Sequence, residues 1–171
     1  KVIPGNADIS IYEIIKKCAL NEKDEKKLMN YIIQKKRIFI STPFSRAAAD
    51  RLNKFGVPAF KIGSGECNNY PLIKYVCKFK KPIILSTGGA TLKDVKAAVK
   101  NITRYNKNLS VLQCTASYPA DWKDMNLNVL ETYKKKFKNH VVGLSDHEAG
   151  IQAASLAFML GARVFEKHFT L

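Results

Sequence analysis

The feature that most constrains the fold is a unit repeated along the chain: a short apolar run, a polar loop and an amphipathic helical stretch. The strands predicted from the apolar runs are Ile38–Ser41, Ala59–Ile62, Pro82–Ser86, Ser110–Cys114, His140–Leu144 and Arg163–Lys167. The predicted helices are Glu22–Lys36 (N-cap Asn21), Arg46–Lys54, Tyr70–Lys78, Thr91–Arg104, Asn126–Phe137 and Glu148–Leu160. Strands that alternate with helices pair in parallel through right-handed crossovers, so this pattern predicts an α/β fold.

Polar residues follow every predicted strand. They stand at Ser41-Thr42, Lys61 to Glu66, Ser86 to Gly89, Thr115 to Tyr118, Ser145 to His147 and Glu166 to His168. An open doubly wound sheet gathers its ligand groups at one switch point, whereas a (β/α)8 TIM barrel collects them from many strands. The even distribution favours the barrel, but a complete barrel needs about 250 residues, and the chain has 171. We therefore expect residues 1–171 to be an incomplete TIM barrel with about six of the eight βα units.

Charge and cysteine content narrow the partners and the compartment. The net charge is +15, from 29 Lys and Arg against 14 Asp and Glu. The lysines fall mostly at helical spacing, which is typical of solvated helix faces, so we expect no nucleic-acid partner and a surface that attracts small anions. The longest apolar run, Ala153 to Leu160, is far shorter than a membrane helix. Cys18, Cys67, Cys77 and Cys114 form no Cys-x-x-Cys pair, which indicates free thiols in a cytoplasmic protein.

Two histidines follow consecutive predicted strands. Because side chains alternate along a strand, His147 shares a face with Ser145, and His168 shares a face with Glu166. The two imidazoles are therefore expected to be neighbours at one rim of the barrel. Two imidazoles with a nearby carboxylate suit a divalent metal with open positions for water or substrate. The alternative is that each histidine only makes hydrogen bonds within its own loop.

A lysine interrupts an otherwise apolar strand before a glycine-rich loop. Lys61 must either reach the surface along its aliphatic stem or face an anion in the barrel mouth. The loop that follows, Gly63 to Glu66, offers backbone N–H groups of the kind that bind phosphate oxygens, although Gly-Ser-Gly alone is commonly a plain turn. Hydroxyl groups at Ser86, Thr87 and Ser145 make phosphate or carboxylate binding the better interpretation.

Several motifs carry a family resemblance. They are Ile3 to Asp8, Ser41 to Phe44, Phe60 to Leu72, Leu85 to Gly88, Gln113 to Thr115, Gly143 to His147 and Glu166 to Thr170. In this order they resemble the sialic acid synthases, which include the N-acetylneuraminate, legionaminate and pseudaminate synthases. The resemblance implies a transferase of sialic acid biosynthesis. Such an enzyme condenses phosphoenolpyruvate with an N-acylated mannose-type sugar to a nine-carbon 2-keto acid and releases phosphate.

The resemblance also implies roles for individual residues. His147 and His168 match the positions that hold a divalent metal, Mn²⁺ or Mg²⁺. The positions that hold phosphoenolpyruvate correspond to Lys61, Ser64, Ser86, Ser145 and Thr42, and those that contact the amino sugar correspond to Glu66, Asn6 and Tyr118. The chain departs from some bacterial members at Ala116, where they have an asparagine. The resemblance further implies that the first two strands, a closing helix and a C-terminal antifreeze-like domain are absent here, that the full-length protein is a homodimer, and that the fragment alone is inactive.

Two other functions stay open. One is a related phosphoenolpyruvate-dependent synthase that uses a phosphorylated sugar and therefore has a second phosphate site. The other is a non-catalytic barrel that binds anions or nucleic acid, for which salt-dependent binding without phosphate release would be the sign.

Overall fold

The computed structural model describes residues 8–169 and divides the chain into two compact units, Lys1–Phe39 and Ile40–Leu171. The first unit contains helices α1 (Ile11–Cys18) and α2 (Glu22–Gln34). α2 and its N-cap confirm the prediction, since Asn21 Oδ1 accepts the Asp24 N–H at 2.9 Å. α1 was not predicted, although its start carries a capping box in which Glu13 accepts the Ser10 N–H at 3.1 Å. None of the described helices is long and apolar enough to cross a membrane.

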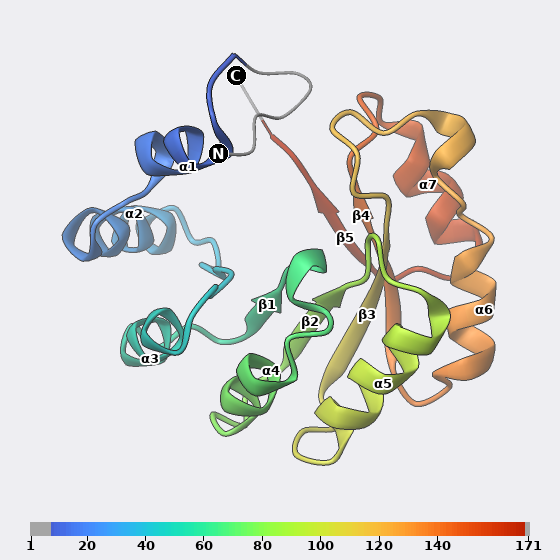
Figure 1. Ribbon diagram of the computed structural model, residues 1–171, viewed down its shortest axis with the longest axis horizontal. Helices are drawn as coiled ribbons and strands as arrows, with labels where there is room; N and C mark the ends of the chain where they lie inside the picture. The colour runs from blue at the N-terminus through green and yellow to red at the C-terminus, as the bar shows by residue number, and fades with distance from the viewer. Residues whose placement is uncertain (1–7, 170–171) are drawn as a thin grey trace. The chain divides into compact units, whose positions relative to one another are not determined.

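The second unit is a five-stranded parallel sheet in the order β1-β2-β3-β4-β5 (Figure 1). The strands are β1 (Phe60–Ile62), β2 (Ile83–Ser86), β3 (Leu109–Cys114), β4 (Val141–Asp146) and β5 (Val164–Lys167). The helices are α3 (Arg46–Lys54), α4 (Tyr70–Cys77), α5 (Leu92–Thr103), α6 (Val129–Lys136) and α7 (Gln152–Met159), and short 3₁₀ turns form at Ser64–Glu66 (η1) and Trp122–Asp124 (η2). The parallel α/β class and the strand–helix alternation are confirmed.

The prediction of a first strand at Ile38–Ser41 is wrong. This segment forms no strand, so the described sheet has five strands rather than the expected six. The segment crosses the boundary between the two units, and Ile38 is 74% exposed. A parallel strand needs apolar cover on both faces, which an exposed isoleucine does not have. A single long hydrogen bond, from the Lys61 N–H to the Ser41 carbonyl oxygen at 3.4 Å, connects the segment to β1.

The sheet is strongly curled, as an ion pair between its two edge strands requires. Lys61 on β1 and Glu166 on β5 approach to 3.1 Å. Strands lie about 4.8 Å apart, so the first and fifth strands of a flat sheet would be about 19 Å apart, too far for these side chains to bridge. Helices α4 to α7 lie along the convex side (Figure 1). The five strands thus form a curled half-barrel, and the TIM barrel with about six of eight βα units stays a prediction.

Alternation along the strands separates the core from the concave face. On β1 to β4 the apolar side chains of the convex side are almost fully buried under the helices; they include Phe60, Ile62, Ile83, Leu85, Val111, Val142 and Leu144. The intervening positions, such as Lys61, Ser86, Ser145 and Glu166, belong to the concave face. The apolar face that is expected to drive folding is thus the one that the helices cover, which leaves the other face for polar groups.

Candidate active site

The concave face brings together two of the predicted phosphate-binding side chains, Lys61 of β1 and Ser86 of β2. The Lys61 side chain is 11% exposed, and its amine pairs with Glu166. The Ser86 hydroxyl, on a residue that is 1% exposed, lies 3.5 Å from the same Glu166 carboxylate and donates to it. Thr42, Lys61, Glu166 and Lys167 line a cavity of about 360 Å³ on this face, which we call the Lys61 cavity. Lys61 therefore faces this cavity rather than the outer surface, as one of the two interpretations of the sequence predicted.

The glycine-rich loop after β1 contacts the ends of β2 and β3. Ser64, the first residue of η1, accepts the Gly88 N–H at 2.9 Å and donates to Cys114 Sγ at 3.3 Å. A side chain at Gly88 would meet both partners, because its Cβ would lie 2.9 Å from Cys114 Sγ and 3.0 Å from Ser64 Oγ. The glycine at this position is therefore required by the close approach of two other chain segments.

Glu66, at the end of η1, is held within its own loop. Its carboxylate accepts a hydrogen bond from Asn69 Nδ2 at 2.6 Å, and Asn69 in turn caps α4 by accepting the Leu72 N–H at 3.2 Å. The structure thus places this predicted sugar-contact residue at the start of a helix. Asn6, the other predicted sugar contact in this part of the sequence, lies outside the described residues.

The two histidines are neighbours, as the strand alternation predicts. Their ring centroids are 5.3 Å apart, and the half-exposed Tyr118 ring packs against both, at 4.1 Å from His147 and 5.4 Å from His168. His147 Nδ1 lies 2.8 Å from the Thr115 carbonyl oxygen. In the neutral imidazole, Nδ1 carries the proton and donates to this carbonyl, which leaves the Nε2 lone pair free for a metal.

This arrangement fits a metal ion in part. Imidazoles that bind one ion at about 2 Å have their ring centroids about 5 Å apart, as observed here. Within residues 8–169, however, no group of three or more His, Cys, Asp or Glu side chains could hold a metal. The expected neighbouring carboxylate, Glu166, is paired with Lys61 instead. His147 and His168 can therefore supply two ligands, with water and substrate as the others.

The end of β4 is anchored by a nearly buried carboxylate. Ser145 and Asp146 are each 3% exposed. The Asp146 carboxylate pairs with Lys167 at 2.7 Å and accepts the Glu148 N–H at 2.9 Å. A buried charge requires such a partner, because dehydration without one is costly. These contacts tie the end of β4, and hence the loop that carries His147, to β5.

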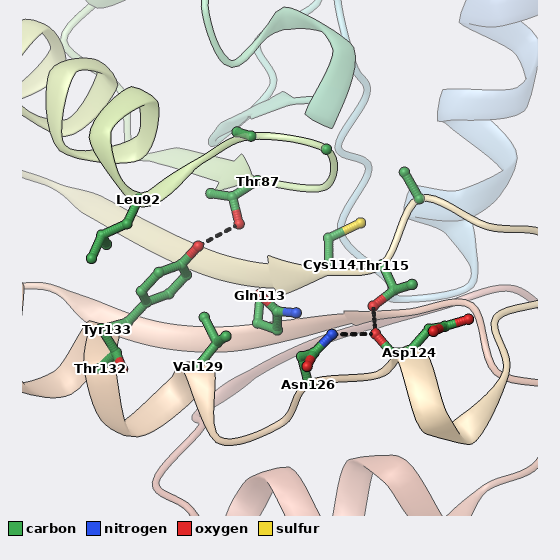
Figure 2. Close-up of a pocket in the computed structure, with 13 residues that line it drawn as sticks. Thr87, Leu92, Gln113, Cys114, Thr115, Asp124, Asn126, Val129, Thr132 and Tyr133 are labelled. Atoms are coloured by element: carbon green, nitrogen blue, oxygen red, sulfur yellow. Dashed lines mark hydrogen bonds between the residues drawn. The ribbon is translucent and has the colours of Figure 1, made fainter.

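A second cavity, of about 490 Å³, was not predicted from the sequence (Figure 2). We call it the Tyr133 cavity; among its lining residues are Thr87, Gln113, Cys114, Ala116, Asn126 and Tyr133. Gln113 lies on the convex side of β3, in register with the apolar Leu144 of β4 and after the apolar Leu109 and Val111 of its own strand. A glutamine within an apolar strand was the signal that could have located this cavity. Tyr133 gave no such signal, because it occupies what looks like an ordinary core position of an amphipathic helix.

The curled parallel sheet and the polar side chains on its concave face and rim define an α/β protein of the half-barrel type. The chain belongs to the NeuB family, whose model matches residues 3–171. It is 40% identical to an N,N'-diacetyllegionaminic acid synthase of Campylobacter jejuni over 96% of this chain and 50% of that protein. It is 35% identical to the mouse N-acetylneuraminate-9-phosphate synthase, over 85% of this chain and 41% of that one.

A solved structure has the same fold. The N-acetylneuraminic acid (sialic acid) synthetase of Leptospira borgpetersenii, in complex with citrate, superposes with a TM-score of 0.88 and 30% sequence identity. The match covers 92% of this chain and 55% of that one. The chain therefore spans about half the length of the relatives it matches.

Proposed function

We propose that the full-length protein condenses phosphoenolpyruvate with an N-acylated mannose-type sugar, giving a nine-carbon 2-keto sugar acid and free phosphate. The observation that carries the proposal is that Lys61 and Ser86 share the concave face, while His147 and His168 lie together at the rim. These are the positions at which the sialic acid synthases bind phosphoenolpyruvate and metal. The names of the relatives, which are synthases of three such acids, support the same reaction class.

Each group would have one task in this reaction. Lys61 would neutralise the negative charge of phosphoenolpyruvate, with Thr42, Ser64, Ser86 and Ser145 as hydroxyl donors. His147 and His168 would hold a divalent cation, Mn²⁺ or Mg²⁺, which when bound supplies Lewis-acid polarisation of the sugar aldehyde oxygen.

The covalent changes belong to the substrates. The methylene carbon of phosphoenolpyruvate forms a bond to the aldehyde carbon, water adds at the former enol carbon, and phosphate leaves with its bridging oxygen. Tyr118, whose ring packs on both histidines, would cover the reacting carbons. Glu66 and Asn6 would hold the sugar hydroxyl and acylamino groups. We also propose, from the resemblance, that the full-length enzyme works as a cytoplasmic homodimer; the four cysteines are free thiols, which supports a reducing compartment.

A synthase that uses a phosphorylated sugar is the second candidate, since one relative is named an N-acetylneuraminate-9-phosphate synthase. The test is phosphate release by the full-length protein with phosphoenolpyruvate, Mn²⁺ and a panel of N-acylated hexosamines, each free and 6-phosphorylated. Turnover of a free sugar supports the proposal, and turnover of only phosphorylated sugars supports the second candidate. No release with any sugar, together with salt-dependent nucleic-acid binding, would contradict both.

A further inference from the structure

The Tyr133 cavity differs from the rest of this basic chain because it has no positive charge. Its lining comprises 13 residues (Figure 2). As far as the structure describes the chain, none of them is Lys, Arg or His, and the single acidic one is Asp124. The sequence as a whole contains 29 Lys and Arg. An anion such as phosphoenolpyruvate would lose its hydration here without gaining a cation. The cavity therefore fits a neutral ligand.

The hydrogen bonds of the inner wall determine what the wall offers to a ligand. The Thr87 hydroxyl donates to the Leu112 carbonyl oxygen at 2.8 Å. The Tyr133 hydroxyl, 2.9 Å from Thr87 Oγ1, must then be the donor of that pair, so its own oxygen is left as an acceptor. Burial raises the pKa of Tyr133, which keeps this hydroxyl protonated. Gln113 Nε2 donates to the Met125 carbonyl oxygen at 3.3 Å, which leaves its Oε1 as another acceptor.

The outer wall has the same character. Asn126 Nδ2 and Thr115 Oγ1 each donate to the Asp124 carbonyl oxygen at 2.9 Å (Figure 2). Asn126 Oδ1 and the Asp124 carboxylate are then the acceptors on this side. A wall with several acceptors and no cation is complementary to a ligand that carries O–H and N–H donors and no negative charge. Among the proposed substrates, the polyhydroxylated sugar meets this description and phosphoenolpyruvate does not.

The cavity adjoins the histidines. Cys114 lines it, and Cys114 Sγ lies 3.9 Å from His147 Nδ1. Its volume of about 490 Å³ lies within the range of about 300–1,000 Å³ that is usual for small-molecule sites. A sugar whose aldehyde carbon lies at His147 could thus extend past Cys114 into this cavity.

We propose that the Tyr133 cavity binds the hydroxylated carbon chain of the acceptor sugar. The inference rests on the proposed function, because that function supplies the sugar. It makes Tyr133, Gln113 and Asn126 determinants of sugar specificity, whereas Lys61 and the hydroxyls of the concave face bind the anionic substrate.

The experiment fills the Tyr133 cavity with a larger side chain introduced at the surface of α6. Thr132, a partly exposed residue of α6, lines the cavity, so Thr132→Trp occupies its space without disturbing the core. In the full-length enzyme we expect the KM for N-acetylmannosamine to rise at least about tenfold and the KM for phosphoenolpyruvate to change by less than about twofold. Lys136→Trp, at an exposed position of the same helix, is the matched control and should change neither. Tyr133→Phe, which removes one acceptor, should raise the sugar KM about fivefold.

A direct binding measurement separates this inference from the proposed function. Saturation-transfer NMR with N-acetylmannosamine alone should detect binding to the wild type and to Lys136→Trp, and lose it in Thr132→Trp, with circular dichroism melting as the check on folding. Failure of the wild type to release phosphate with any sugar would remove the proposed function, and the NMR result would still decide the role of the cavity. Unchanged sugar binding in Thr132→Trp and Tyr133→Phe, or equal increases in both KM values, would overturn the inference.

Discussion

The Lys61 cavity and the Tyr133 cavity differ most clearly in charge. The first is lined by two lysines and a glutamate, and the second, along its described lining, has no cation. The Lys61 cavity belongs to the concave face of the sheet, whereas the Tyr133 cavity extends to Gln113 on the convex side of β3 and to Tyr133 of α6. This difference supports the proposal that a charged and a neutral substrate bind in separate places. The Tyr133 cavity is next to the histidines through Cys114, whose Sγ lies 3.9 Å from His147 Nδ1.

The largest effect is expected at His147, which lies next to Cys114 of the Tyr133 cavity. His147→Ala in the full-length enzyme should lower turnover at least about a thousandfold, because the remaining histidine is a single ligand. Metal analysis should detect loss of bound Mn²⁺, and phosphate release measures the turnover. His140→Ala is the matched control, since His140 precedes β4 at the opposite end of the strand. A His147→Ala protein that retains metal and normal turnover would refute the metal assignment.

Lys61→Ala should affect one substrate only. Loss of a charged partner of a bound anion costs several kcal/mol, so the KM for phosphoenolpyruvate should rise about 100-fold or more. The KM for the sugar should stay within about threefold, because the Tyr133 cavity is unchanged. The variant also leaves Glu166 without its partner at 3.1 Å. Lys61→Ala/Glu166→Gln should therefore recover part of the lost affinity, and initial-rate kinetics measure both. Equal effects on the two substrates would count against this separation.

Gly88→Ala should affect both substrates, because Gly88 packs against Ser64, a proposed phosphoenolpyruvate contact, and against Cys114, which lines the Tyr133 cavity. The added Cβ would push against Cys114 Sγ at 2.9 Å and against Ala116 Cβ and Ser64 Oγ, both at 3.0 Å. We expect kcat/KM to fall about tenfold for each substrate, with the Tm lowered by a few degrees, as about 1 kcal/mol of crowding implies. Steady-state kinetics and thermal melting provide the measurement. An effect confined to phosphoenolpyruvate would contradict the expectation that Cys114 and the Tyr133 cavity contribute to sugar binding.

The smallest effect is expected in thiol reactivity, which should differ between Cys114 in the wall of the Tyr133 cavity and the core cysteines Cys67 and Cys77. Burial raises the pKa of the Cys67 and Cys77 thiols to about 11. At pH 8 a thiol of this pKa is about 0.1% thiolate, so both should react slowly, and about tenfold faster per pH unit until the pH approaches 11. Cys114 lines the Tyr133 cavity and should be modified before them in a protein that carries Cys18→Ser. Mass spectrometry after iodoacetamide treatment measures the order, and added N-acetylmannosamine should slow the reaction of Cys114 alone. Faster labelling of Cys77 would contradict the comparison.

Much of the fold could be predicted because its signals are local. Strand alternation predicted that the two histidines are neighbours, and their ring centroids are 5.3 Å apart. It left the direction of Lys61 open, and the ion pair with Glu166 places it on the concave face. The strand at Ile38–Ser41 was predicted on the same apolar signal and failed, because a strand also needs cover that its own sequence does not supply. The Glu66 carboxylate is engaged by Asn69, a local contact that a family resemblance could not indicate.

The sequence by itself determined the alternation of the five described strands with helices, the faces of these strands and the cap at Asn21, since these depend on residues within one or two turns of each other. Tertiary structure alone decided the pairing of Lys61 with Glu166, because that contact needs curvature accumulated over four neighbouring strand pairs. It also decided the Tyr133 cavity, whose wall forms only when α6 packs against the end of β3 and the Tyr133 hydroxyl meets Thr87. Local alternation can assign a side chain to a face, but the distance between two side chains on that face depends on how the whole sheet bends.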